Sequence, residues 1–262
     1  YHEVKALNEE LKGFREVEQL SSKVAIIFDY DAASAWEIQP YGKNLNYFNL
    51  IFEVYRALRK LGQSIDILPS SHKNFSDYKI VFVPGLIYMS EDLKKILSEF
   101  NGQVFLGPRT AIREENLNTP VPLPPNLPAF NSKIVLTESF RSDSAIELEK
   151  GGNFNNYREI FKGNAEVIEK TVDGIPAILR GGNFNYIGGW LNSIALNRIV
   201  LDALNKENIS SLNLPTGVRV RATNKERFWF NYSPKVQETI IGNLKPGEVF
   251  IENLDLDQAK FN

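Results

Sequence analysis

The sequence of 262 residues contains no cysteine and only two histidines, His2 and His72. Without cysteine, the chain cannot form a disulfide, a thiolate zinc site or a cysteine nucleophile. Two histidines are too few for a metal centre built from several imidazoles, and a Ser-His-Asp triad would have to use one of them. No motif pairs a serine with either histidine, and we interpret His72 as a solvent-exposed turn residue. We therefore expect no metal site.

Charge of one sign is also lacking, because 30 Lys and Arg residues stand against 32 Asp and Glu residues. This balance gives no general attraction to nucleic acid or to an anionic membrane. The longest apolar runs, such as residues 80–83, have the length of a strand, whereas a spanning helix needs roughly 20 apolar residues. Residues 1–23 are charged throughout and lack the apolar centre of a signal peptide. We expect a cytoplasmic protein that binds neither nucleic acid nor membrane.

Glycine motifs that hold phosphate groups are missing as well. The glycine pairs at residues 181–182 and 188–189 match neither the dinucleotide-binding pattern nor the P-loop pattern. We therefore expect no cofactor.

The sequence does contain a core, since 43% of its residues are apolar and 11% are aromatic. The continuous apolar run KVAIIF at residues 23–28 predicts a strand that is buried on both faces of a parallel sheet. A stripe of apolar residues predicts a helix over residues 44–61. Further strands are predicted at residues 64–68, 78–83 and 103–106, and a further helix, capped by Ser90, at residues 90–100. This alternation predicts an α/β fold with an open, doubly wound sheet.

Three loops follow the predicted parallel strands, at residues 29–41, 84–89 and 107–128. The loops at the carboxyl ends of such strands usually carry the function. The third loop contains six prolines. It is either a rigid surface excursion in polyproline II conformation or an ordered arm that packs on another domain or subunit.

The second half of the chain has a different pattern. After a strand at residues 133–136, the stretch 165–187 has the character of antiparallel strands, and a helix is predicted over residues 193–205. Short alternating strands are then predicted at residues 218–222, 227–231, 236–241 and 248–252. A small antiparallel module therefore begins between Asn205 and Gly217.

Carboxylate pairs are the first candidates for chemistry, because hydrolases commonly use two. Asp29 and Asp31 follow the first strand, and we interpret them as a capped turn with solvated charge. Glu114 and Glu115 lie in the proline-rich loop, where we interpret them as structural residues that could order the loop by pairing with Arg109 or Arg113. The Asn8-Glu9 dipeptide occurs at the acid/base of many glycosidases, but here it lies within a charged helix face. The residues alone therefore reveal no catalytic machinery.

Aromatic residues gather around the first loop, where Tyr30, Trp36, Tyr41 and Tyr47 lie close in sequence. Aromatic rings near a strand end stack on sugars, and they also anchor protein interfaces. The pattern leaves both functions open.

Several segments resemble, in order and spacing, the part of glycoside hydrolase family 42 β-galactosidases that follows the catalytic barrel. They are residues 23–36 (KVAIIFDYDAASAW), 47–62 (YFNLIFEVYRALRKLG), 83–88 (VPGLIY), 106–116 (LGPRTAIREEN), 124–128 (PPNLP), 173–190 (DGIPAILRGGNFNYIGGW), 214–218 and 228–233. Residues 1–18 are similar to the last helix of the barrel.

The resemblance implies a domain order and a division of labour. It implies that residues 1–22 are a helix remnant of a preceding barrel, that residues 23–206 form a flavodoxin-like trimerisation domain related to class I glutamine amidotransferases, and that residues 207–262 form a small antiparallel β domain. In this family the catalytic glutamates lie on the barrel, so none maps onto this chain. Because the chain has no cysteine, amidotransferase activity is not expected either.

Two functional hypotheses follow. In the first, the chain is the non-catalytic trimerisation part of a β-galactosidase, with a homotrimer and the catalytic barrel as its partners, and it is inactive alone. The parent enzyme would hydrolyse terminal non-reducing β-D-galactosides. In the second, the chain is a stand-alone α/β module that binds a sugar or a protein. In either case the candidates for interface or sugar contacts are Trp36, Tyr41, Arg109, Arg113 and Glu115.

Overall fold

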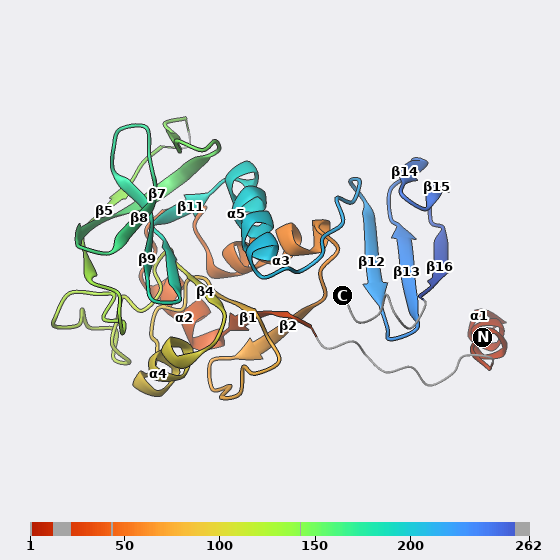
Figure 1. The fold of residues 1–262 in the computed structure, drawn as a ribbon, viewed down its shortest axis with the longest axis horizontal. Helices are drawn as coiled ribbons and strands as arrows, with labels where there is room; N and C mark the ends of the chain where they lie inside the picture. Colours follow the sequence, from red (N-terminus) through yellow and green to blue (C-terminus); the bar gives the residue numbers. More distant parts are fainter. Residues whose placement is uncertain (1, 13–21, 43, 142, 255–262) are drawn as a thin grey trace. The chain divides into compact units, whose positions relative to one another are not determined.

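The computed structural model describes residues 2–12, 22–42, 44–141 and 143–254 (Figure 1). The chain forms two compact units, of which the larger is Ser22–Thr216 and the smaller contains Gly217–Asn262 together with the amino-terminal segment. In the part of the chain that the structure describes, no helix is long and apolar enough to span a bilayer.

The larger unit is built on a seven-stranded mixed sheet with the order β2-β1-β3-β4-β10-β9-β8. The first five strands of that order run parallel, and β9 and β8 are antiparallel to their neighbours. The strands are β1 (Val24–Phe28), β2 (Ile65–Pro69), β3 (Ile80–Val83), β4 (Gln103–Leu106), β8 (Glu166–Lys170), β9 (Pro176–Gly181) and β10 (Phe184–Ile187). The central strands β3, β4 and β10 are buried along their whole length, as two covered faces require.

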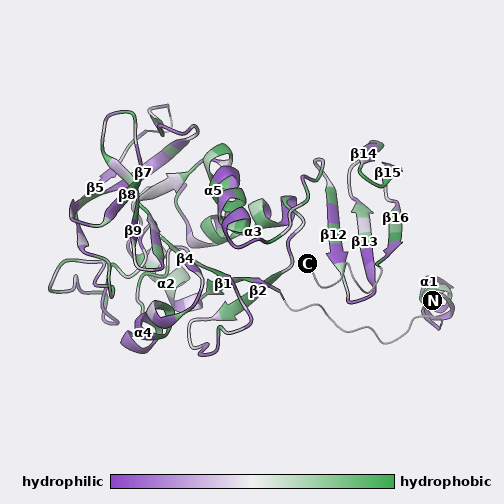
Figure 2. Cartoon of the chain, in the orientation of Figure 1, coloured by the Kyte–Doolittle hydropathy of each residue, from purple (hydrophilic) through white to green (hydrophobic). Residues whose placement is uncertain are grey.

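Helices cover both faces of this sheet. α3 (Tyr47–Lys60) and α5 (Ser193–Lys206) lie side by side on one face, and α4 (Glu91–Glu99) lies on the opposite face (Figure 1). Asn46, Ser90 and Asn192 cap these helices, and each side chain accepts a hydrogen bond from a main-chain N–H of the first turn. Figure 2 shows that the strands at the sheet centre are mainly hydrophobic, whereas α4 carries many hydrophilic residues.

The first loop contains a helix that the sequence analysis did not predict. α2 (Tyr30–Ile38) begins directly after β1, and Asp29 is its N-cap. Its apolar residues are mostly alanines, which give a weak hydrophobic stripe even though Ala32, Ala33 and Trp36 are buried. The prediction of a loop over residues 29–41 was therefore wrong for most of its length.

A second, smaller sheet has the order β11-β7-β5, with β6 also paired to β7. Its strands are β5 (Ser132–Ser139), β6 (Ile146–Glu147), β7 (Asn153–Gly163) and β11 (Gly189–Leu191). β7 was not predicted, because this strand contains six polar or charged residues among eleven and does not alternate regularly. The predicted strand at residues 133–136 exists as part of β5, but it pairs with β7 outside the seven-stranded sheet.

The smaller unit contains a sheet of the order β12-β13-β16 and a separate hairpin, β14-β15. The strands are β12 (Val218–Ala222), β13 (Glu226–Asn231), β14 (Gln237–Thr239), β15 (Gly242–Leu244) and β16 (Val249–Asn253). The predicted strand over residues 236–241 is wrong in its second half, where the chain turns through Gly242, which has a φ of +109°. Trp229 is the largest buried side chain among the described residues of this unit.

The amino-terminal helix α1 (His2–Leu11) carries Val4 and Leu7, which are 69% and 53% exposed. Phe14 lies outside the described residues.

Candidate functional site

Four of the five candidate residues lie together near the carboxyl ends of β3 and β4. The guanidinium of Arg109 lies between two aromatic rings, with its carbon 4.2 Å from the ring centre of Trp36 and 4.0 Å from that of Tyr41. Both distances are in the range of cation–π contacts. Tyr41 stacks in turn on Tyr157, with 5.7 Å between ring centres. The stacked rings and the guanidinium therefore join three parts of the unit: α2, strand β7, and the segment that follows β4.

Arg109 is held from several directions. Its Nη2 donates to the main-chain oxygen of Gln39 at 2.8 Å, and its main-chain N–H donates to Oε1 of Glu159 at 2.9 Å. The side chain is fully buried, and Nε and Nη1 have no acceptor among the described residues. Burial lowers the pKa of Arg109 to about 10, although Tyr157, Tyr41 and Glu159 favour the charged form. The guanidinium therefore remains charged at neutral pH.

Arg113 completes the link between α2 and the segment after β4. Its Nε donates to Oε1 of Gln39 at 3.0 Å, and its Nη2 donates to the Tyr41 hydroxyl at 2.8 Å. Within the described residues, neither Glu114 nor Glu115 forms an ion pair with Arg109 or Arg113. The expected loop-ordering pair is therefore wrong. Arg109 donates through Nη2 to the Gln39 carbonyl, and Arg113 donates to Gln39 and Tyr41 instead of to a glutamate. Glu115 is exposed and lies outside the cluster.

Glu159, which was not a candidate from the sequence, is the acidic residue of the cluster. Its Oε1 also accepts from the hydroxyl of Tyr157 at 3.0 Å. Burial raises the pKa of Glu159 to about 7, against the lowering effect of hydrogen bonds from Arg109 and Tyr157. Both residues lie on the unpredicted strand β7, two positions apart and thus on one face. That spacing is the one signal that would have indicated them.

Thr110 was also missed, and it joins the ends of two parallel strands. Its hydroxyl accepts from the N–H groups of Gly85 and Gly107 at 3.0 and 2.8 Å, and it donates to the carbonyl of Val83 at 2.7 Å. The indole of Trp36 donates to the carbonyl of Gly85 at 2.8 Å. The strand ends and the cluster therefore form one hydrogen-bonded network.

Burial decides what this cluster offers to a partner. Arg109 is fully buried and Trp36 is 2% exposed, while Tyr41 and Arg113 are half-buried. Most of the cluster is therefore interior, and its physical effect is to hold α2 and the proline-rich segment on the sheet.

The paired carboxylates after β1 have a structural role, as expected. Oδ1 of Asp29 accepts from the main-chain N–H groups of Asp31 and Ala32 at 2.8 and 3.0 Å, and Ser70 donates to its other oxygen. Asp31 lies exposed in the first turn of α2. The interpretation of a capped turn is confirmed. His72 is half-buried, and its Nε2 lies 2.6 Å from the carbonyl of Asn74 in a turn.

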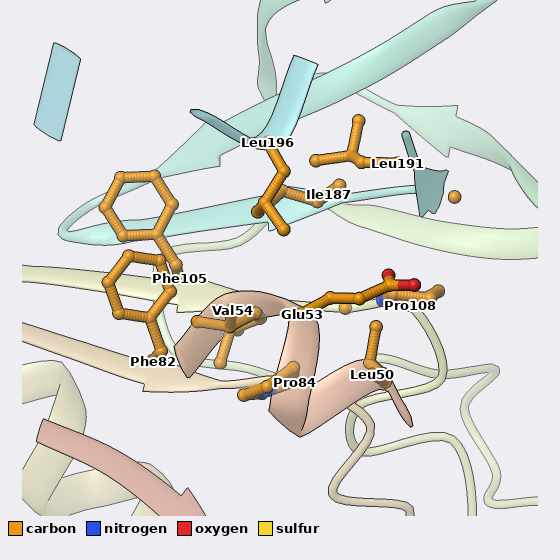
Figure 3. Close-up of a pocket in the computed structure, with 13 residues that line it drawn as sticks. Leu50, Glu53, Val54, Phe82, Pro84, Phe105, Pro108, Ile187, Leu191 and Leu196 are labelled. Atoms are coloured by element: carbon orange, nitrogen blue, oxygen red, sulfur yellow. The ribbon is translucent and has the colours of Figure 1, made fainter. Parts of the chain in front are cut away.

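An apolar pocket lies between α3 and the carboxyl-terminal halves of β3 and β4, with about 390 Å³ of empty space that includes its open mouth. Figure 3 shows the rings of Phe82 and Phe105 at one end and the carboxylate of Glu53 beside Pro108 at the other. Burial raises the pKa of Glu53. A retaining glycosidase needs two carboxyl groups roughly 5–5.5 Å apart, whereas the residues that line this pocket supply one.

A second hollow lies between α2 and α3, with about 790 Å³ of empty space that includes its open mouth. We call it the α2–α3 hollow. Its lining is mainly apolar and aromatic, and it includes Trp36, Pro40, Leu45, Tyr47 and Phe48. Across the described part of the chain, no group of three or more metal-binding side chains gathers in either place or elsewhere.

The fold and its site define a mixed α/β domain followed by small antiparallel sheets. The family described as beta-galactosidase trimerisation domain matches residues 22–210. The chain therefore belongs to this family, which is part of the glycoside hydrolase family 42 β-galactosidases.

Relatives of known identity agree with this assignment. The β-galactosidase of Thermus thermophilus is 30% identical over 247 residues, which cover 91% of this chain and 38% of that protein. The crystal structure of a β-galactosidase from the psychrophilic Marinomonas ef1 matches 95% of this chain and 40% of its own, with 27% identity and a TM-score of 0.83. The Halorubrum lacusprofundi enzyme shares the fold at 23% identity, with a TM-score of 0.85 over 94% of this chain and 42% of its own. The chain spans about two fifths of the length of these relatives.

Proposed function

We propose that this chain is the assembly part of a β-galactosidase that hydrolyses terminal non-reducing β-D-galactosides, and that it forms a homotrimer. The observation that carries the proposal is the match of residues 22–210 to a trimerisation domain, together with relatives of which the chain covers about two fifths. The catalytic barrel of the parent enzyme is the second expected partner. Sedimentation of the chain as a trimer is the direct test.

The fold supports a finer assignment. The parallel strands follow the order β2-β1-β3-β4-β10, which corresponds to the flavodoxin-like order 2-1-3-4-5. We assign the larger unit to the flavodoxin-like architecture of class I glutamine amidotransferases on this basis, with residues 23–206 as the trimerisation domain and residues 207–262 as the small β domain.

The chain is expected to be inactive alone. Asp29 is occupied as a helix cap, and Glu53 stands without a second carboxylate in its pocket. The pure chain, assayed with a chromogenic β-galactoside, should give no turnover. The matched control is a double variant, Asp31→Ala with Glu115→Ala, which removes the two exposed carboxylates of the strand-end loops. Turnover that persists through purification and disappears in this variant would contradict the proposal.

A second candidate function rests on the α2–α3 hollow, where the ring of Phe48 is exposed. Aromatic walls stack on sugar rings, so a sugar-binding module is the alternative. Titration calorimetry of the chain with galactose and lactose separates the two functions. Saturable heat from a chain that remains monomeric would favour the alternative.

A further inference from the structure

We propose that the α2–α3 hollow of one copy receives the proline arm, residues 119–128, of the next copy in the trimer. The inference rests on the proposed assembly function and names the two surfaces that carry it out. Five observations support it: the exposure of the arm tip, the uncharged sequence of the arm, the lining of the hollow, the distance between the two within one copy, and the symmetry of a trimer.

The arm has a fixed base and an exposed tip. Pro124, Pro125 and Leu127 are buried, and the carbonyl of Pro124 accepts from the N–H of Ile134 at 2.6 Å. At the tip, Val121 is 94% exposed and Leu123 is 46% exposed. An apolar tip on a proline-stiffened base loses little conformational entropy on docking. The arm therefore has the properties of a preformed ligand.

Charge gives the arm its preference for an apolar site. Residues 116–132 contain no charged side chain. Docking this segment into an apolar hollow therefore requires no charged group of the arm to leave water.

The hollow has the chemistry that proline-rich segments bind. Proline-rich segments dock in grooves that are lined by aromatic rings, and the half-exposed ring of Phe48 lines the hollow here, alongside the buried rings of Trp36 and Tyr47. The aromatic surface continues past the rim, because Phe48 contacts Phe28 with 5.6 Å between ring centres and Phe28 contacts Tyr30 at 4.9 Å. Tyr30 and Phe48 are 74% and 50% exposed. Aromatic residues of this kind are enriched at protein interfaces.

Within one copy, β5 separates the arm from the hollow. Ile134 of β5 is bonded to the arm base, whereas Ser139 at the other end donates to the carbonyl of Tyr41, between the lining residues Pro40 and Gly42. Five residue steps along a strand span about 17 Å. The arm base and the hollow are thus different surfaces of the unit.

Symmetry requires two such surfaces. A closed ring of three identical copies uses heterologous contacts, in which one patch of each copy meets a different patch of the next. The arm and the hollow are such a pair, since one projects and the other is concave. A second copy of this chain is therefore the occupant that we assign to the hollow.

The absence of cysteine makes a direct test available. A chain with Val121→Cys at the arm tip and Glu37→Cys at the exposed rim of the hollow is oxidised gently and separated without reductant. Covalent trimers are expected from the double variant, and covalent dimers from a mixture of the two single variants. The matched control pairs Val121→Cys with Ile194→Cys, which is 65% exposed on α5 and should give no trimer.

A second variant tests the same contact without crosslinking. Val121→Asp should leave the unfolding of the chain unchanged and weaken self-association by about tenfold or more. If the wild-type chain is trimeric and the cysteine pair does not link copies beyond the control, the hollow has another occupant, such as a sugar or a domain of the longer enzyme, and this proposal is overturned. If the wild-type chain is monomeric, the proposed function fails with it.

Discussion

Glu159 brings a carboxyl group into the interior of the larger unit, with the main chain of Arg109 and the hydroxyl of Tyr157 as its donors. Its pKa is raised from 4.5 to about 7 in the folded chain. Between these two pH values the folded state binds more protons than the unfolded state, so this residue's contribution to stability falls as pH rises and is constant above about pH 7.

The pH dependence of unfolding measures this effect. Glu159→Gln keeps an acceptor for both donors and removes the titration, so its free energy of unfolding should rise relative to wild type from pH 4.5 to 7. A pKa shift of this size corresponds to a change of about 3 kcal/mol in the free energy of unfolding of the variant relative to wild type. Urea unfolding at both pH values tests it, with the exposed Glu115→Gln as control. Parallel pH profiles for wild type and Glu159→Gln would contradict the assignment.

Arg109 owes its position to the planar shape of its guanidinium as well as to its charge. Arg109→Lys keeps a cation but loses the stacking on Trp36 and Tyr41 and the fork of donors. We expect the free energy of unfolding to fall by about 2 kcal/mol, since a desolvated cation–π contact is worth that order. Arg113→Lys, at a half-buried position, should cost less in the same urea titration. Equal losses of unfolding free energy in the two variants would show that the burial and stacking of Arg109 do not contribute to stability.

At the scale of elements, the ends of β4 and β10 approach each other closely at Gly107. A Cβ at Gly107 would lie 2.2 Å from the carbonyl oxygen of Ile187, and the residue has a φ of +81°. Gly174 has a similar φ of +85° but open space around it. Gly174→Ala therefore measures the backbone strain alone, about 1–2 kcal/mol.

Gly107→Ala combines the same backbone strain with the clash, so it should lower the free energy of unfolding by at least about 2 kcal/mol more than Gly174→Ala. Thermal or urea unfolding of both variants provides the comparison. A matching loss in the two variants would mean that the strand ends are not packed as closely as described.

The elements that could be predicted from the sequence are those with a strong local signal. α3 has a continuous apolar stripe behind Asn46, α4 has Ser90 as its cap, and β1 is a pure apolar run. α2 and β7 lacked such signals, because alanines give little hydrophobic contrast and β7 is rich in polar residues whose burial depends on tertiary partners.

The residues of the candidate site that could be predicted were also those with a local signal in the sequence. Loops at strand ends indicated Trp36, Tyr41, Arg109 and Arg113, and these four residues do lie together. Glu159 and Thr110 were not among the candidates, because their roles depend on contacts between segments 50 and 25 residues apart in sequence. Burial, too, is a tertiary property, and it places Arg109 in the interior instead of at a surface.

At the scale of the whole molecule, the larger unit has the features of a support for assembly. Near the strand ends, Thr110 and Arg109 form hydrogen bonds with main-chain groups of the same unit. Apolar side chains of the proline arm and aromatic side chains beside the α2–α3 hollow are exposed. A surface of this kind is suited to contact with protein. Self-association is therefore the function that the surface of the larger unit supports best.

The mass of the chain in solution tests that claim most directly. Light scattering on the purified chain, at concentrations from about one to about a hundred micromolar, spans the dissociation constants of moderate and good interfaces. The account predicts a mass that approaches three times the 29.8 kDa of one chain and stays there as concentration rises. A mass of 29.8 kDa over the whole range, or a plateau at twice that value, would contradict it.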